Sequence, residues 1–348
     1  MYKKSKLVVM ISLLVMFALV VAGCGGSGGS SSGGDKKPEA KPVKWVVNEA
    51  YPPNNHHSIG LVDFAAKVKE ATNGKIEMDV QAGGALGYKG PELLKVVRDG
   101  LVPVTDLVIS GVAGDEPMFG VVTLPFLVHS HEEARLLHQI ARPYFDKVAE
   151  EKWNQKILYN APWPAAGFWA QKELRTLEDM KGLKTRTYDK NGALVMEALG
   201  ATPYPLPFSE VYSSLATGVI DSVLTSSPTA VDGKFWEVLK YYAPVNVTQA
   251  VNMVTVNLDE FNKLDKETQE TLIKLAQEME EEMWAMVAEL DKEKEQECND
   301  NGIVTLEPSE ELMNDLSEIT EGIRADWLKD APPEAKEIVA KFKEKVGR

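Results

Sequence analysis

Between residues 43 and 110 the chain alternates β-like runs with helical patterns, and this order restricts the fold more than any other feature. The β-like segments are rich in valine, isoleucine and methionine, and proline or glycine marks the helix boundaries. Strands that alternate with helices favour an α/β domain with parallel strands. In chain order we predict a strand at 43–47, a helix at 58–74, a strand at 76–80, a helix at 90–100 and a strand at 104–110.

A similar but separate alternation follows, and it predicts a second α/β lobe with a cleft between the two. Its expected elements are a helix at 131–153, a strand at 156–164, a capped turn and strand at 176–189, a helix at 190–200, a helix from 209 and a strand at 219–224. Residues 265–297 then read as one helix, with leucine and methionine at helical spacing. A helix of roughly 30 residues reaches about 45 Å, so we expect it to cross both lobes.

The N-terminus has the pattern of an export signal. Lys3, Lys4 and Lys6 precede an apolar run from Leu7 to Ala22, which is shorter than a typical membrane-spanning helix. The run ends in "VVAGC", which is similar to the lipidation signal of bacterial lipoproteins. We therefore predict a signal peptide at 1–23 and an acylated Cys24. An uncleaved anchor helix is the alternative.

A tract rich in glycine and serine follows, and we interpret residues 24–42 as a tether between the membrane and the folded part. Besides Cys24 the chain has only Cys298, so a lipidated Cys24 leaves no internal disulfide, and the core must hold the domain together. The formal net charge of −14 argues against binding nucleic acid or lying flat on an anionic membrane.

The residues that would make an enzyme are not evident. There is no Walker A sequence, "GGALG" lacks the context of a dinucleotide fingerprint, and no carboxylate cluster suggests a metal. We predict no cofactor and no metal. His57 lies in a loop between a strand and a helix, where ligands of open α/β sheets bind, so we place it at the cleft. The rival function is an exported α/β hydrolase or lyase with His57 as its base.

Arg186 stands in the middle of the predicted strand "KTRT", where an arginine is unusual. It can serve as a carboxylate-binding group in the cleft, because a guanidinium meets a carboxylate with two parallel hydrogen bonds. Alternatively it forms a surface ion pair with Asp179 or Asp189. The residues alone leave both readings open.

Three segments resemble one known family in order and spacing. They are "EDMKGLKTRT" (178–187), "ALGATPYPLPFSEVYSSLATGVIDS" (198–222) and "KFWEVLKYY" (234–242). Together they look like the solute-binding protein of a tripartite ATP-independent periplasmic (TRAP) transporter, the DctP family. Weaker agreement extends over nearly the whole mature chain.

The resemblance implies a two-lobed periplasmic-binding-protein-like fold that closes on an organic acid. It also implies a small and a large membrane permease subunit as partners. The family's ligand arginine falls on Arg186. Where many members carry a second arginine, this sequence has Trp169, which puts a second ligand carboxylate in doubt. We predict that Trp169 and Trp163 form aromatic walls, that Phe208 packs on the acid and that Thr225 hydrogen-bonds it.

These observations predict a monomeric, lipid-anchored extracytoplasmic TRAP receptor, on the periplasmic side if the host has an outer membrane. Its expected ligand is a monocarboxylate with an apolar or aromatic body, such as a 2-oxo or aryl acid. A C4-dicarboxylate receptor and a sensory receptor are the alternatives. We expect one lobe to comprise residues 43–166 and 251–290, and the other residues 167–250 and 291–348.

Overall fold

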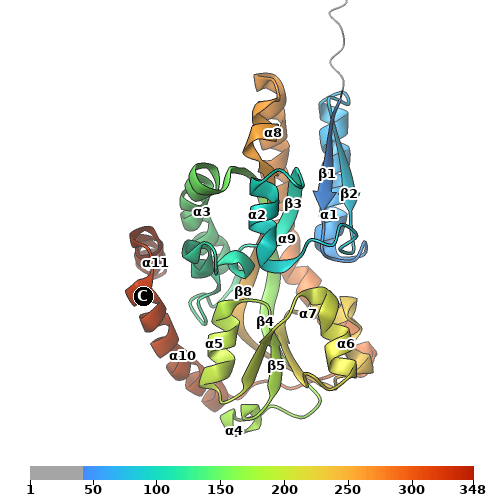
Figure 1. Ribbon diagram of the computed structural model, residues 1–348. Helices are drawn as coiled ribbons and strands as arrows, with labels where there is room; N and C mark the ends of the chain where they lie inside the picture. The colour runs from blue at the N-terminus through green and yellow to red at the C-terminus, as the bar shows by residue number, and fades with distance from the viewer. Residues whose placement is uncertain (1–41) are drawn as a thin grey trace, which may run out of the picture. The chain divides into compact units, whose positions relative to one another are not determined.

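The computed structural model describes residues 42–348, so the predicted signal peptide, Cys24 and almost all of the tether lie outside the described residues. The strands join in one mixed sheet (Figure 1). They are β1 (Val43–Asn48), β2 (Ile76–Gln81), β3 (Val104–Val108), β4 (Gln155–Ala170), β5 (Lys184–Thr187), β6 (Thr202–Pro205), β7 (Ser222–Thr225), β8 (Tyr241–Asn257) and β9 (Val304–Thr305).

The strand order is β2-β1-β3-β8-β4-β7-β5-β6, and β9 pairs with β8. At each end the pairing is parallel: β1 with β2 and β3, and β5 with β6 and β7. The predicted α/β fold with parallel strands is therefore confirmed. The middle differs, because β8 pairs antiparallel with both β3 and β4, and β4 pairs antiparallel with β7.

Helices cover both faces of the sheet. The α-helices are α1 (His56–Ala71), α2 (Leu93–Arg98), α3 (His131–Trp153), α4 (Leu177–Met180), α5 (Lys190–Ala198), α6 (Val211–Ala216), α7 (Ser227–Asp232), α8 (Leu258–Asn262), α9 (Lys266–Asp300), α10 (Glu310–Asp330) and α11 (Pro333–Val346). The 3₁₀ helices are η1 (Gly90–Glu92), η2 (Ser110–Val112), η3 (Pro117–Thr123), η4 (Phe208–Glu210) and η5 (Phe235–Glu237).

The long strands β4 and β8 connect two groups of elements, one with α1, α2 and α3 and the other with α5, α6 and α7 (Figure 1). They have 16 and 17 residues, and their pairing shifts register between Pro162 and Ala165. A proline has no N–H to donate to the ladder, so it is tolerated at such a bulge. A bulge also redirects side chains, and this one contains Trp163 and Pro164.

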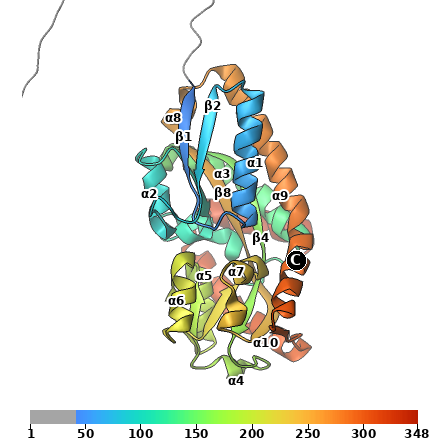
Figure 2. The ribbon, with the colours of Figure 1, turned by 90° about the vertical axis from the view of Figure 1, so that its right-hand side faces the viewer.

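The core divides as expected for two lobes. Residues of β1, β3 and α1 pack in one apolar cluster, and residues of α2, α3 and η3 pack in a neighbouring one. Two further clusters form around α5 and around α6 and η5. Helix α9, capped by the Asp265 side chain, contributes Leu272 and Met279 to a cluster of the first lobe and Cys298 to one of the second. The prediction of a long helix that spans both lobes is confirmed (Figure 2).

The C-terminal helices differ from the expected division of the chain. In α10, Leu312 and Leu316 pack in the cluster around α5. In α11, Ile338 and Phe342 pack in the cluster with α3 and η3, which belongs to the first lobe. The segment 291–348, predicted to belong to one lobe, therefore contacts both.

Gly167 permits the close contact of β4 with β8. A Cβ atom at this position would lie 2.5 Å from the Ala243 carbonyl oxygen and 2.6 Å from a ring carbon of Tyr242. The carbonyl is fixed by the strand pairing and the Tyr242 ring is buried in a stack on Trp169, so neither can move away without a cost in packing. Only glycine fits here without moving one long strand away from the other.

We expect Gly167→Ala to lower the free energy of unfolding by about 1–3 kcal/mol, because overpacking forces the strands apart. Urea unfolding would measure the change. The matched control is Gly114→Ala, where no heavy atom lies within 4 Å of the added Cβ, and its effect should stay within about 0.5 kcal/mol. Equal stability of the two variants would contradict this account of the strand contact.

Candidate functional site

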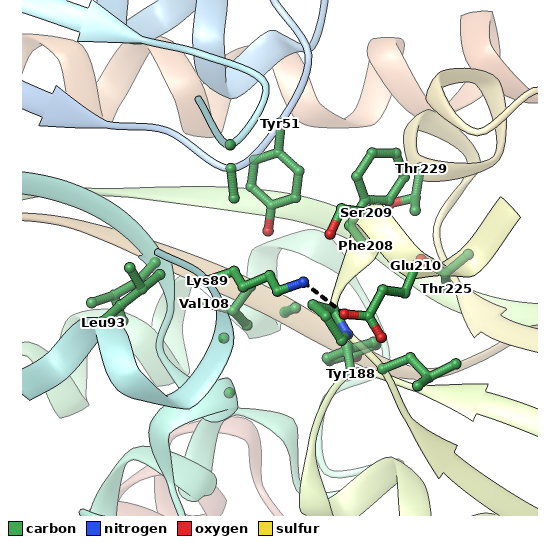
Figure 3. Close-up of a pocket in the computed structure, with 18 of the residues that line it drawn as sticks. Tyr51, Lys89, Leu93, Val108, Tyr188, Phe208, Ser209, Glu210, Thr225 and Thr229 are labelled. Atoms are coloured by element: carbon green, nitrogen blue, oxygen red, sulfur yellow. Dashed lines mark hydrogen bonds and ion pairs between the residues drawn. The ribbon is translucent and has the colours of Figure 1, made fainter. Parts of the chain in front are cut away.

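A cavity of about 740 Å³ lies between the two groups of elements (Figure 3). Its walls come from the loops after β1 and β2, from β3, from the bulge of β4 and from the segments that follow β5, β6 and β7. Most of the lining side chains are apolar or aromatic. A cavity with apolar walls and few polar groups suits a small organic ligand.

Arg186 lines this cavity and is buried. It lies in β5, between β6 and β7, and its Nε donates a hydrogen bond to the Leu206 carbonyl at 2.9 Å. Its guanidinium carbon lies 5.9 Å from the centre of the Tyr188 ring. Burial lowers the pKa of Arg186 to about 10, against an ordinary value of 12.5. This shift reflects the cost of holding a desolvated cation.

No carboxylate of residues 42–348 pairs with Arg186 within 4.0 Å. Asp189 caps α5 and accepts from the Gly192 N–H at 2.8 Å. Asp179 closes the capping box of α4 with Thr176. The surface ion pair considered for Arg186 is therefore wrong.

Aromatic rings form one wall of the cavity. Tyr51, from the loop after β1, lies with its ring centre 4.8 Å from that of Trp163 and 6.0 Å from that of Phe208. The Trp163 indole donates to Asn252 Oδ1 at 2.8 Å, which fixes the ring. Trp163 and Phe208 thus lie on the cavity, as the sequence predicted.

Thr225, predicted to hydrogen-bond the ligand, and Trp169, predicted to form a second aromatic wall, differ in where they lie. Thr225 lines the cavity at the end of β7. Trp169 does not: it is fully buried in the core of the second lobe and stacks on Tyr242 with ring centres 3.9 Å apart. Its indole donates to the Thr225 carbonyl at 3.0 Å. Side chains alternate along a strand outside its irregularities, and Trp169 lies after the bulge, on the face that packs against η5.

His57 also lies behind the cavity wall rather than on it. The ring is buried and stacks on Trp163, with ring centres 4.3 Å apart. Its Nδ1 is 3.1 Å from Asp106 Oδ2. Helix α1 begins at His56, two residues before the predicted start at residue 58. His57 therefore belongs to the first turn of the helix and points into the core rather than lying in a loop. The expectation that His57 faces the cleft is corrected accordingly.

Several lining residues were not found from sequence. Tyr51, Asp106 and Tyr188 line the cavity, as do Lys89 and Glu210. Lys89 Nζ lies 2.6 Å from Glu210 Oε1, and this ion pair joins the residue that precedes η1 in the first lobe to η4 of the second (Figure 3). The signal for Tyr51 was present in the sequence, because it begins the same strand-to-helix loop that drew attention to His57.

Within residues 42–348 no three side chains of histidine, cysteine, aspartate or glutamate come together in a way that could hold a metal ion. Nor is any helix in this part of the chain long and apolar enough to cross a bilayer.

Comparison with known proteins gives the family. Residues 47–330 match the model of DctP, described as bacterial extracellular solute-binding protein, family 7. The chain belongs to the DctP family. It is an extracytoplasmic solute receptor of the TRAP type, and such receptors work with membrane permeases; it is not an enzyme.

Solved structures agree with the two-lobed fold. A TRAP solute-binding protein from a marine metagenome, specific for pyroglutamate, is 32% identical with a TM-score of 0.83, over 87% of this chain and 99% of that one. DctP7 of Bordetella pertussis, which binds pyroglutamic acid, is 27% identical with a TM-score of 0.84, over 86% and 99%. The monocarboxylate 2-oxoacid-binding periplasmic protein of Nostoc is 28% identical over 66% of this chain and 64% of its own.

A second contact joins the lobes beside the cavity. Asn55 caps α1 by accepting from the His57 N–H, and its Nδ2 donates to Asp232 Oδ2 at 2.5 Å, at the end of α7. Burial raises the pKa of Asp232 from 3.8 to about 6, although Asn55 and Lys294 act in the opposite direction. The folded protein therefore binds a proton at Asp232 more tightly than the unfolded chain does.

We expect the wild type to lose stability relative to Asp232→Asn as the pH rises from about 4 to 7. A carboxyl group whose pKa is higher in the folded protein stabilises the fold at pH values below 3.8, its pKa in the unfolded chain. This contribution is lost as the pH rises through about 6. The difference should reach up to about 3 kcal/mol. Urea unfolding of both proteins at each pH would measure it. A pH-independent difference would show that Asp232 titrates normally.

Proposed function

We propose that this receptor binds a monocarboxylate with an apolar or aromatic body and grips its carboxylate with Arg186. The observation that carries the proposal is a buried guanidinium on the cavity with no anionic partner in the described part of the chain. Only its Nε makes a hydrogen bond to the protein there, so both Nη nitrogens are free to donate. This geometry suits bidentate binding of a carboxylate.

The energetics favour an anionic ligand for the same reason. Taking a guanidinium out of water costs free energy, which the lowered pKa of Arg186 reflects. A ligand carboxylate would offset that cost with charge-assisted hydrogen bonds in a poorly solvated cavity. A neutral analogue would leave the cation unpaired, so the site selects for acids.

The cavity walls determine the shape and polarity of the ligand beyond its carboxylate. Tyr51, Trp163 and Phe208 offer apolar area and ring faces, which suit a compact ring or a short apolar chain. The other cation on the cavity, Lys89, is already paired with Glu210, so a second ligand carboxylate would lack a free partner. Relatives named for pyroglutamate and for 2-oxo acids agree with a monocarboxylate, whereas one relative of 28% identity is named for C4-dicarboxylates, so the preference rests on the single free cation that residues 42–348 place on the cavity.

The mechanism we propose is hinge closure. The two lobes would bend about β4, β8 and α9, and the ion pair of Lys89 with Glu210 would form as the cavity closes. We retain residues 43–166 with 251–290 and residues 167–250 with 291–348 as the proposed lobes, with α11 bound back onto the first.

The remaining proposals concern the cellular setting. The receptor would be acylated at Cys24, held to the outer face of the cell membrane by the tether, and would deliver its ligand as a monomer to a small and a large permease subunit. The pattern "VVAGC" and the glycine- and serine-rich tract support this arrangement. Labelling with a fatty acid that Cys24→Ala abolishes would test the anchor. Transport assays with the permease would distinguish this arrangement from the alternative, in which the receptor serves a sensory partner.

We expect Arg186→Met to weaken binding at least about 100-fold, because the ligand carboxylate loses a buried charged partner. The acid would be chosen by a thermal-shift screen of organic acids, since a ligand that binds only the native state raises the melting temperature, and calorimetry would give the affinity. The unliganded variant should be no less stable than wild type, because a desolvated charge is removed.

The matched control is Arg175→Met, since Arg175 is exposed and pairs with Glu173 outside the cavity. Its affinity should equal that of wild type. Retention of wild-type affinity by Arg186→Met would refute the proposed role of Arg186.

A further inference from the structure

The carboxylate that Arg186 would bind can accept more hydrogen bonds than the guanidinium donates to it. A carboxylate offers about four lone-pair sites on its two oxygens, and bidentate binding to the two Nη nitrogens uses about two of them. An acceptor that stays unpaired in a poorly solvated cavity costs free energy. A further donor on the cavity wall would therefore strengthen the binding of the acid.

The first lobe places a hydroxyl group on this cavity. Tyr51 follows β1, and its hydroxyl points into the cavity (Figure 3). The hydrogen bonds of Tyr51 use its backbone: its N–H donates to Glu49 Oε1 at 2.8 Å, and its carbonyl accepts from Ser58 Oγ at 3.2 Å and from the Gly83 N–H at 2.6 Å. The hydroxyl donates to no side chain or carbonyl of residues 42–348, so its hydrogen is available to a ligand.

The ring of Tyr51 is held between aromatic neighbours from both lobes. Its centre lies 4.8 Å from that of Trp163, in an edge-to-face contact with an angle of 69° between the rings. The His57 ring lies 5.8 Å away, and Phe208 of the second lobe lies 6.0 Å away. These contacts, together with the backbone bonds, fix the direction of the hydroxyl. A donor that is already ordered before the ligand arrives loses little conformational entropy on binding.

Tyr51 borders the same segment of the second lobe that holds Arg186. The Leu206 carbonyl accepts from Arg186 Nε at 2.9 Å, and two residues later the Phe208 ring contacts Tyr51. Pro207 between them is extended, and two residues of extended chain span at most about 7 Å. All these residues line the cavity. The phenol and the guanidinium therefore border one small part of it, where a group as small as a carboxylate can meet both.

The Tyr51 phenol is a donor at neutral pH. Burial raises the pKa of Tyr51 above its ordinary value of 10, so the hydroxyl keeps its proton. The Asn252 amide lowers this pKa by a smaller amount, because it acts on the phenol as a hydrogen-bond donor. A donor on the oxygen leaves the hydroxyl hydrogen free for another partner.

Building on the proposed function, we infer that Tyr51 is a ligand-binding residue: from the first lobe, its hydroxyl donates a hydrogen bond to the carboxylate that Arg186 binds from the second. Hydrogen bonds to an ionised acceptor are roughly twice as strong as neutral ones. Because the two residues belong to different lobes, both contacts exist together only when the lobes are closed. A ligand favours one conformation only through contacts that differ between conformations, so Tyr51 couples recognition of the carboxylate to closure.

Tyr51→Phe removes the hydroxyl and keeps the ring that packs on Trp163 and Phe208. Calorimetry should show a loss of affinity of at least about 10-fold, as expected for a hydrogen bond to a charged group. Stopped-flow measurements should assign most of this loss to faster dissociation, because the contact forms after the acid has met Arg186 in the open receptor. The unliganded variant should melt at the same temperature as wild type.

Two probes distinguish the carboxylate from the rest of the ligand. L-pyroglutamate is cyclic and 4-methyl-2-oxopentanoate is an open chain; the tightest cyclic and open-chain acids of the thermal-shift screen replace them if they do not bind. Because the carboxylate is the group that both probes share at the same position, Tyr51→Phe should weaken the two by factors that agree within about 3-fold.

The matched control is Tyr212→Phe, which removes a hydroxyl outside the cavity. Tyr212 is exposed, and its hydroxyl donates to Glu237. This variant should bind both probes as wild type does.

Wild-type affinity of Tyr51→Phe for both probes would overturn the inference, since Tyr51 would then serve only as an apolar wall. A loss confined to one probe would overturn it as well, because the hydroxyl would then contact the body of that acid. The proposed function fails separately: it is wrong if wild type binds no acid, or if Arg186→Met binds acids as wild type does. A weakened Arg186→Met beside an unchanged Tyr51→Phe would refute only the role of Tyr51.

Discussion

The antiparallel pairing of β4 with β8 is the constraint on which the rest of the structure depends. Both strands are long enough to serve both lobes, and every other strand joins the sheet through them. Their contact requires Gly167, and their irregular register between Pro162 and Ala165 brings Trp163 to the cavity. The same pair of strands therefore joins the lobes and shapes the ligand site.

Much of the fold was predictable because periodicity and capping are local signals. The helix beginning after Asp265 and the parallel strands of each lobe follow from them. β8 was not predicted, since its residues 241–257 are buried on both faces and mix valine with threonine, glutamine and asparagine, so no apolar face alternates with an exposed one. The return of α11 to the first lobe was also missed, because packing partners far apart in the chain leave no local pattern.

The site was predictable where the chemistry of one residue is unusual for its position. An arginine inside a strand pointed to Arg186, and Trp163, Phe208 and Thr225 also lie on the cavity. Trp169 and His57 do not. The face that Trp169 presents depends on the bulge of β4, and that of His57 depends on a helix start two residues earlier than predicted. Asp106 gave no signal, since an acid inside a strand does not by itself show that the strand borders a cavity.

The course of the C-terminal helices has a mechanical consequence. The chain passes between the lobes not only in β4, β8 and α9 but again where α10, packed beside α5, leads to α11 on α3. A joint made of several links that are not in line resists twisting while it still permits bending. In the proposed hinge closure, these links would reduce the motion to a single opening coordinate, and the two halves of the site would meet in the same alignment at every cycle.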